Sequence, residues 1–206
     1  MICRRPCSFW QVATFLAGLL PVMQLAAVAP VVLPGVQGGS YSLHMTSLKE
    51  IRFRNTIRQK YDFSCGSAAV ATLLTYQYGY PVDEQEAFVQ MYARGDRPKI
   101  NREGFSLLDI KRFLQANGFD ADGFQVPLEK LRQENLPAIV LIDERGYHHF
   151  VVIKGLRDGR VLVGDPARGT RSIPRAQFDA AWKNHLVFVI HNRRALARFN
   201  TSDDWR

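Results

Sequence analysis

One cysteine, Cys65, has a setting that suits nucleophilic chemistry. It follows Ser64 and opens a stretch of small apolar residues that predicts a buried helix. The amino end of a helix presents unpaired N–H groups and a partial positive charge, and both stabilise a thiolate, the nucleophilic form of cysteine. We therefore interpret Cys65 as a candidate nucleophile, against the common alternative of an inert buried cysteine.

Gln59, six residues before Cys65, carries a side chain that can complete such a site. Its amide can reach back toward the cysteine and donate a hydrogen bond to the oxyanion that forms when a thiolate attacks a carbonyl carbon. The backbone N–H of Cys65 would supply the second donor. Gln59 is thus a candidate oxyanion donor.

A base and a residue to orient it lie in the second half of the chain. His148 and His149 precede an apolar run, 150–153, and because strand side chains alternate, only one of the two can face Cys65. Asp165 begins the turn after the next predicted strand, where its carboxylate can accept a hydrogen bond from the imidazole. Each signal is weak alone, since such residues are often structural. Together, the order Cys, His, Asp matches a papain-like arrangement.

The elements that must position these residues follow a simple order, with helices before strands. The predicted helices cover 64–78, 83–93, 106–117, 127–134 and 174–182. The predicted strands are short β-branched runs at 51–53, 138–142, 150–154, 160–163, 170–173 and 186–190. Residues 94–104 are polar, contain Gly and Pro, and predict a loop. The expected fold class is α+β, a helical lobe followed by a mostly antiparallel sheet, with a cleft between them.

The N-terminal segment, residues 1–40, has the pattern of an export signal. Arg4 and Arg5 precede a long apolar run, 9–33. One interpretation is a cleaved signal peptide; the other is an uncleaved anchor, because the run exceeds the roughly 18 residues that span a bilayer. Both interpretations place the remainder outside the cytoplasm. We expect a periplasmic protein, either soluble or tethered to the inner membrane by this segment.

The remainder divides into a domain at 41–192 and a basic polar tail at 193–206, which we expect to fray. Cys3 and Cys7 lie in the leader, so the exported domain keeps Cys65 alone and forms no internal disulfide. The formal net charge is +8, but the basic residues are scattered, which favours a solvated surface over nucleic-acid binding. No cysteine pair has the spacing of a zinc site, so neither a metal nor another cofactor is expected.

Three motifs together resemble a known family. Residues 59–69, 149–153 and 164–166 look like the corresponding motifs of the peptidase C39 family, which includes the N-terminal peptidase domains of bacteriocin-exporting ABC transporters. The resemblance implies a papain-like fold and cleavage after a Gly-Gly pair in substrate leaders. It also implies that His149, rather than His148, is the base. By the same resemblance the nucleophile is Cys65, the orienting residue is Asp165 and the oxyanion donor is Gln59.

The chain departs from the transporter-linked members in its domain content. It has no ATPase domain and no Walker motif, so ATP binding is not expected. Its layout resembles exported, standalone members that accompany the functional-amyloid (Fap) secretion systems of pseudomonads. That resemblance implies an exported protein or peptide as the substrate.

The expected activity is therefore that of an exported cysteine peptidase, and two alternatives stand beside it. One is a catalytically silent peptidase-like module that binds or chaperones secreted protein; a complete Cys, His, Asp and Gln set argues against it. The other is thiol acyl transfer, which uses the same triad, so the sequence does not separate it from hydrolysis.

Overall fold

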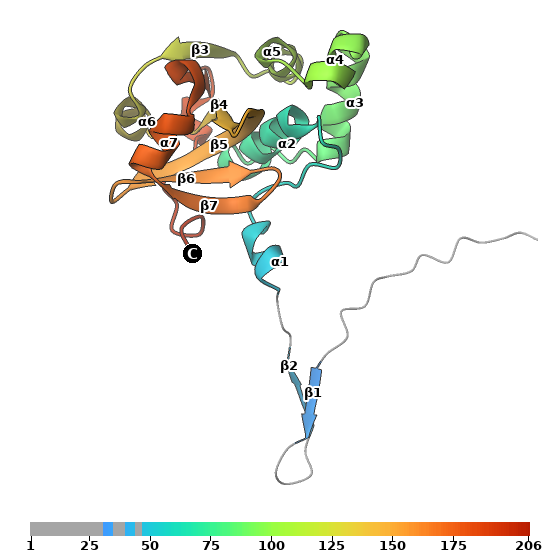
Figure 1. Ribbon diagram of the computed structural model, residues 1–206, viewed down its shortest axis with the longest axis vertical. Helices are drawn as coiled ribbons and strands as arrows, with labels where there is room; N and C mark the ends of the chain where they lie inside the picture. The colour runs from blue at the N-terminus through green and yellow to red at the C-terminus, as the bar shows by residue number, and fades with distance from the viewer. Residues whose placement is uncertain (1–30, 35–39, 44–46) are drawn as a thin grey trace, which may run out of the picture. The chain divides into compact units, whose positions relative to one another are not determined.

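The protein is described by a computed structural model that covers residues 31–34, 40–43 and 47–206 (Figure 1). It divides into two units, and the first of them, Met1–Met45, contains an antiparallel hairpin of β1 (Val31–Pro34) and β2 (Ser40–Leu43). Most of the expected signal peptide or anchor, residues 1–40, lies outside the described residues. Within the described ranges, no helix has the length and apolar character needed to cross a membrane.

The second unit, Thr46–Arg206, contains the helices and the main sheet. Its helices are α1 (Leu48–Arg52), α2 (Cys65–Thr72), the π-helix η1 (Leu73–Gln77), α3 (Glu84–Arg94), α4 (Arg97–Glu103), α5 (Leu107–Ala116), α6 (Leu128–Glu134), α7 (Arg175–Ala181) and the short η2 (Lys183–His185) and η3 (Arg194–Leu196). Its strands are β3 (Ala121–Gln125), β4 (Ala138–Glu144), β5 (Tyr147–Arg157), β6 (Arg160–Asp165), β7 (Gly169–Pro174) and β8 (Leu186–Ile190). In Figure 1, α2 to α5 gather beside strands β4 to β7, which confirms the predicted α+β class.

The six strands form one sheet in the order β3-β8-β4-β5-β6-β7, with every neighbouring pair antiparallel. The turn between β5 and β6 uses Asp158 and Gly159, whose φ angles are 50° and 68°. Positive φ at both central residues is the geometry of the tight hairpin that the Asp-Gly pair predicts. The turn sets the register of β5 against β6 next to it, and a shift of one residue between Ile153 and Gly155 sets the register beyond, so that His149 and Asp165 come to the same end of the sheet.

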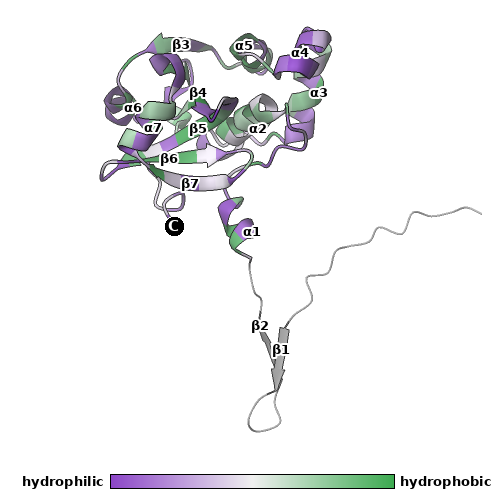
Figure 2. Ribbon diagram, in the orientation of Figure 1, coloured by the Kyte–Doolittle hydropathy of each residue, from purple (hydrophilic) through white to green (hydrophobic). Residues whose placement is uncertain are grey.

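Helix α2 is buried along its whole length, because small and apolar residues leave it no polar face. It packs against β5 in one hydrophobic core, while the opposite face of the sheet forms a second core with α6 and α7. Figure 2 shows the contrast with α4, which is largely hydrophilic and lies at the outside. The buried helix thus holds its amino end, and Cys65 with it, at a fixed place beside the sheet.

Two predictions about local structure are wrong. Residues 51–53, predicted as a strand, lie at the end of helix α1, which a capping box between Ser47 and Glu50 starts. Residues 94–104, predicted as a loop, contain helix α4, which begins after Asp96 and has a proline in its first turn. Strand β3 was not predicted; it is held by pairing with β8.

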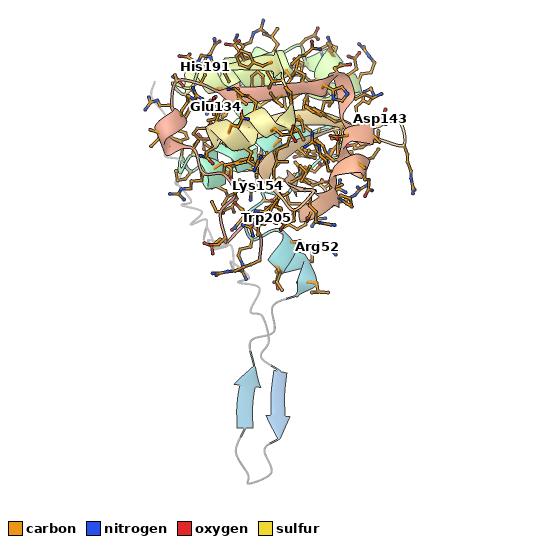
Figure 3. The ribbon with its side chains drawn as sticks, turned by 90° about the vertical axis from the view of Figure 1, so that its left-hand side faces the viewer. Arg52, Glu134, Asp143, Lys154, His191 and Trp205 are labelled. Carbon is orange, nitrogen blue, oxygen red and sulfur yellow. The ribbon has the colours of Figure 1, made fainter. Side chains whose placement is uncertain are left out.

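The C-terminal tail is also ordered where fraying was predicted. The N–H of Asn200 donates to the carbonyl of Lys154 at 2.9 Å, and the N–H of Leu156 donates to Asn200 Oδ1 at 2.7 Å. Asp204 forms a buried ion pair with Lys154. Figure 3 shows Lys154 and Trp205 close together at this end of the domain. The tail therefore completes the core along β5.

Candidate active site

Cys65 is the first residue of α2, and its side chain is buried, with 7% of its surface exposed. Ser64 occupies the N-cap position, but its hydroxyl does not cap the helix. The hydroxyl instead donates to the carbonyl of Tyr61 at 3.0 Å and accepts from the Tyr61 N–H at 3.1 Å. The Ser64 side chain therefore shapes the preceding loop and does not occupy the N–H groups of the first turn beside Cys65.

His149 and Asp165 form a buried pair across strands β5 and β6. The His149 Nε2 atom lies 2.8 Å from Asp165 Oδ1, and both side chains are almost wholly shielded from solvent. The same carboxylate accepts hydrogen bonds from the N–H groups of Ala167 at 2.9 Å and Arg168 at 3.2 Å. Burial acts to raise the pKa of Asp165, but the hydrogen bond and charge of His149, the N–H of Ala167 and the charge of Arg171 outweigh it and hold the pKa below its usual range.

The second imidazole nitrogen of His149, Nδ1, is buried and has no hydrogen-bond partner among the described residues. The Cys65 thiol is near enough to the imidazole to raise the pKa of His149, but no hydrogen bond of normal geometry joins it to Nδ1. Burial alone would lower the pKa of His149, but the interactions with Asp165 and Cys65 outweigh it and raise the pKa to about 9. His149 is therefore protonated at neutral pH when a thiolate stands beside it, as an ion pair of cysteine and histidine requires.

His148 points elsewhere, which agrees with the expectation that only one histidine faces the site. Its side chain is 61% exposed, and its Nε2 atom lies 3.5 Å from Asp143 Oδ2 at the surface. The two adjacent histidines thus differ sharply in environment, and only His149 contacts Asp165.

Gln59 lies in the loop before Cys65, next to the turn that carries Asp165. Its backbone N–H donates to the carbonyl of Pro166 at 3.0 Å. Its side-chain Nε2 donates to the carbonyls of Tyr61 at 3.0 Å and Asp62 at 3.3 Å, while Oε1 is buried and has no hydrogen-bond partner in the part of the chain that the structure describes. Both amide donors are thus held by the loop itself in this structure, and the role of Gln59 as oxyanion donor stays a prediction.

Two residues that the sequence analysis did not single out join the site. Arg171, on β7, donates from Nε to Asp165 Oδ2 at 3.0 Å and pairs with Glu144 at 2.5 Å, so it fixes the outer carboxylate oxygen. Tyr147 stacks on His149 with ring centroids 5.6 Å apart. The alternation of strand β5 could have identified Tyr147, which lies two residues before His149. Arg171 could be found only with the β6–β7 register, which pairs it with Val163.

The described part of the chain contains no group of three or more His, Cys, Asp or Glu side chains placed to hold a metal ion. The arrangement instead supports nucleophilic catalysis. It combines a thiol at a helix start, an imidazole beside it and a carboxylate that orients the imidazole, all on rigid elements.

Comparison with known proteins adds three findings. The sequence profile of the peptidase C39 family matches residues 54–194. Two proteins named probable functional amyloid protease FapD are similar: that of Pseudomonas aeruginosa is 39% identical over 86% of this chain and 79% of its own length. That of Pseudomonas fluorescens is 40% identical over 70% of this chain and 63% of its own length.

Among solved structures, a double glycine motif protease from an AMS/PCAT transporter, in complex with the leader peptide, is similar in sequence and fold. It is 26% identical, covers 66% of this chain and 89% of its own, and gives a TM-score of 0.54. This likeness confirms the predicted papain-like α+β fold.

Proposed function

The chain belongs to the peptidase C39 family and is a cysteine-type peptidase, and on that premise we propose that Cys65 is its nucleophile and His149 its general base and acid. Asp165 orients His149, and Gln59 with the Cys65 N–H stabilises the oxyanion. The observation that carries this assignment is the buried His149–Asp165 pair, whose unpartnered Nδ1 lies beside Cys65.

The proposed reaction has two halves. In the first, the Cys65 thiolate attacks the carbonyl carbon of the scissile peptide bond, and His149 gives its proton to the leaving amine as the C–N bond breaks. In the second, His149 takes a proton from water, whose oxygen attacks the thioester carbonyl and releases the acid product and the thiolate. Asp165 stabilises the imidazolium that both halves require and keeps Nδ1 directed at Cys65.

The oxyanion role requires a change at Gln59. Its Nε2 has two hydrogens, and both point at carbonyls of its own loop. The bond to Asp62 is the longer of the two, at 3.3 Å, so it is the one we expect to break when substrate binds. Turning that hydrogen toward the oxyanion supplies a donor that strengthens only as negative charge develops.

The proposed substrate is an exported protein or its leader, cut after a Gly-Gly pair. Two features support this proposal: the names of the similar proteins, which include a double glycine motif protease and functional amyloid proteases, and the export pattern of residues 1–40. The proposed location is the periplasm, with the protein either soluble or held at the inner membrane by its N-terminal segment.

The test is cleavage of matched peptides by the purified full-length protein. One peptide contains a Gly-Gly pair and the other has Ala-Ala at the same place; products are identified by mass spectrometry, with Cys65→Ser as the control. Cleavage after Gly-Gly only, lost in Cys65→Ser, is the expected result. Equal cleavage of both peptides would overturn the Gly-Gly specificity. Tight binding of the peptide without any product would favour a silent binding module.

A further inference from the structure

We propose that Tyr147 is a positioning residue of the active site, which ties the loop carrying Gln59 to the strand carrying His149. The inference rests on the proposed roles of Gln59 and Cys65 and deepens them. Its basis is a pair of contacts made by one side chain across the site, one through the hydroxyl and one through the ring.

The hydroxyl of Tyr147 reaches from β5 to the loop before Cys65. It donates to the carbonyl of Asp62 at 2.8 Å, and the same carbonyl accepts the 3.3 Å bond from Gln59 Nε2. Because the Tyr147 bond is much the shorter, Tyr147 is the main partner of this carbonyl. It holds the loop in place when Gln59 turns one hydrogen toward the oxyanion.

The ring of Tyr147 covers His149. The two rings stack with centroids 5.6 Å apart and planes 29° apart. His149 itself is buried, whereas Tyr147 is 47% exposed, so the phenol ring stands between the imidazole and solvent. Shielding of this kind strengthens the attraction between an imidazolium and a thiolate, because water screens charge.

The titration of Tyr147 is consistent with a location beside the thiol. Its pKa is raised, first by burial and next by the negative charge of Cys65. The phenol therefore keeps its proton throughout the neutral range and remains a hydrogen-bond donor. A donor fixed between Gln59, Asp62 and Cys65 matters for geometry, since a displacement of about 1 Å in an active site can cost about a hundredfold in rate.

Tyr80 offers a matched control, because it is similarly exposed, packs on another ring and uses its hydroxyl in one hydrogen bond. It is 40% exposed, its ring packs on Phe119 at 5.3 Å, and its hydroxyl bonds the Asn117 side chain at 3.4 Å. Tyr80→Phe should leave kcat and KM unchanged.

The experiment measures kcat, KM and the inhibition constant of a peptide aldehyde, which forms an oxyanion on cysteine, for full-length Tyr147→Phe. This variant keeps the ring and removes the hydrogen bond from the hydroxyl to the Asp62 carbonyl. We expect kcat to fall about tenfold, the inhibition constant to rise by a similar factor and KM to stay near wild type. In a Gln59→Ala background, Tyr147→Phe should have little further effect, because the residue it acts through is gone.

Tyr147→Leu separates the ring from the hydroxyl. It should lower kcat further and shift the pH profile of Cys65 alkylation, whereas Tyr147→Phe should leave that profile in place. Wild-type kcat in Tyr147→Phe, or an equal loss with and without Gln59, would overturn the inference and leave the proposed triad intact. Wild-type kcat in Gln59→Ala would overturn both this inference and the proposed role of Gln59.

Discussion

Strand β5 carries two buried ionic networks that look alike in composition and differ in one respect. At one end, His149 pairs with Asp165; five residues later, Lys154 pairs with Asp204. All four side chains are at least nine-tenths hidden from solvent. Burying charges is costly unless they are paired and hydrogen-bonded, so each network requires an explanation.

In the Lys154 network the charged groups are held only by structural partners. The ammonium donates to the carbonyl of Asn55 at 2.6 Å as well as to Asp204. The Asp204 carboxylate also accepts from three other side chains: Asn55 at 3.3 Å, Gln77 at 3.2 Å and Thr201 at 2.7 Å. In the His149 network the Nδ1 atom has no hydrogen-bond partner among the described residues, and the Cys65 thiol is near enough to act on the titration of the ring. Charges held by structural partners stabilise a fold, whereas an unused imidazole nitrogen near a thiol can take part in a reaction.

Among substitutions in the two networks, the largest expected effect is the loss of activity when His149 is removed. His149→Ala should lower kcat/KM at least about a thousandfold, since a triad acts as a unit and loses most of its power with its base. Its thermal unfolding should change far less than that of a Lys154 variant. A peptidase assay and a thermal melt on the same preparation check this. Retention of activity with a collapse of stability would mean that the two networks have the opposite roles.

The second effect is on stability. Lys154→Met leaves the buried Asp204 without its counter-charge and should reduce the free energy of unfolding by about 3–5 kcal/mol. Activity per folded molecule should remain. Adding Asp204→Asn removes the second charge, keeps an acceptor for Thr201 and should recover most of the loss. Denaturant unfolding measures all three proteins.

Lys130→Met is the matched control for this experiment, because Lys130 pairs with Glu134 at the surface at 2.8 Å. Surface pairs contribute little, so its unfolding should resemble that of wild type. A Lys154→Met protein as stable as the Lys130→Met protein would contradict the structural role assigned to the buried pair.

The third effect is on pH dependence, where the contributions of His149 and Asp204 should be lost at opposite ends of the pH range. With a folded pKa of about 9 against 6.5 unfolded, protonated His149 contributes stability that is complete below 6.5 and lost as pH rises through about 9. Activity should fall over the same alkaline range, because the leaving amine loses its proton donor. The pKa of Asp204 is lowered against burial by Lys154, so its contribution is present above 3.8 and lost at lower pH. An alkaline limb of activity near 6.5 would contradict the His149 assignment.

Sequence alone predicted the parts of the fold that local patterns control. The Asp158–Gly159 turn set the β5–β6 hairpin, and small apolar residues marked the buried helix that begins at Cys65. Helix α4 was missed because its residues are nearly all polar and show no apolar period, although the Asp96 cap and the following proline were visible. Strand β3 was missed because pairing with β8, far along the chain, is what holds it.

In the site, too, local patterns indicated some residues, while others depend on contacts between distant parts of the chain. Its proposed triad could be nominated from residue types and order, and the His149–Asp165 contact is present in the structure. Strand alternation could place Tyr147 on the same face as His149, but it could not reveal the contact of the Tyr147 hydroxyl with Asp62. The contribution of Arg171 depends on the register of two strands, which no local pattern reports. The tail was expected to fray because its polar composition does not reveal that Asp204 neutralises a buried lysine.

The Lys154–Asp204 pair also bears on the time course of synthesis. Asp204 follows Lys154 by 50 residues, and a chain is synthesised from its amino end at about 5–20 residues per second. For several seconds after strand β5 emerges, its lysine has no counter-ion, and closing the core around it is unfavourable. The finished domain, and with it the alignment of His149 on the same strand, therefore has to wait for the tail. A chain that assembles in this order has no aligned His149 until its last residues have been made.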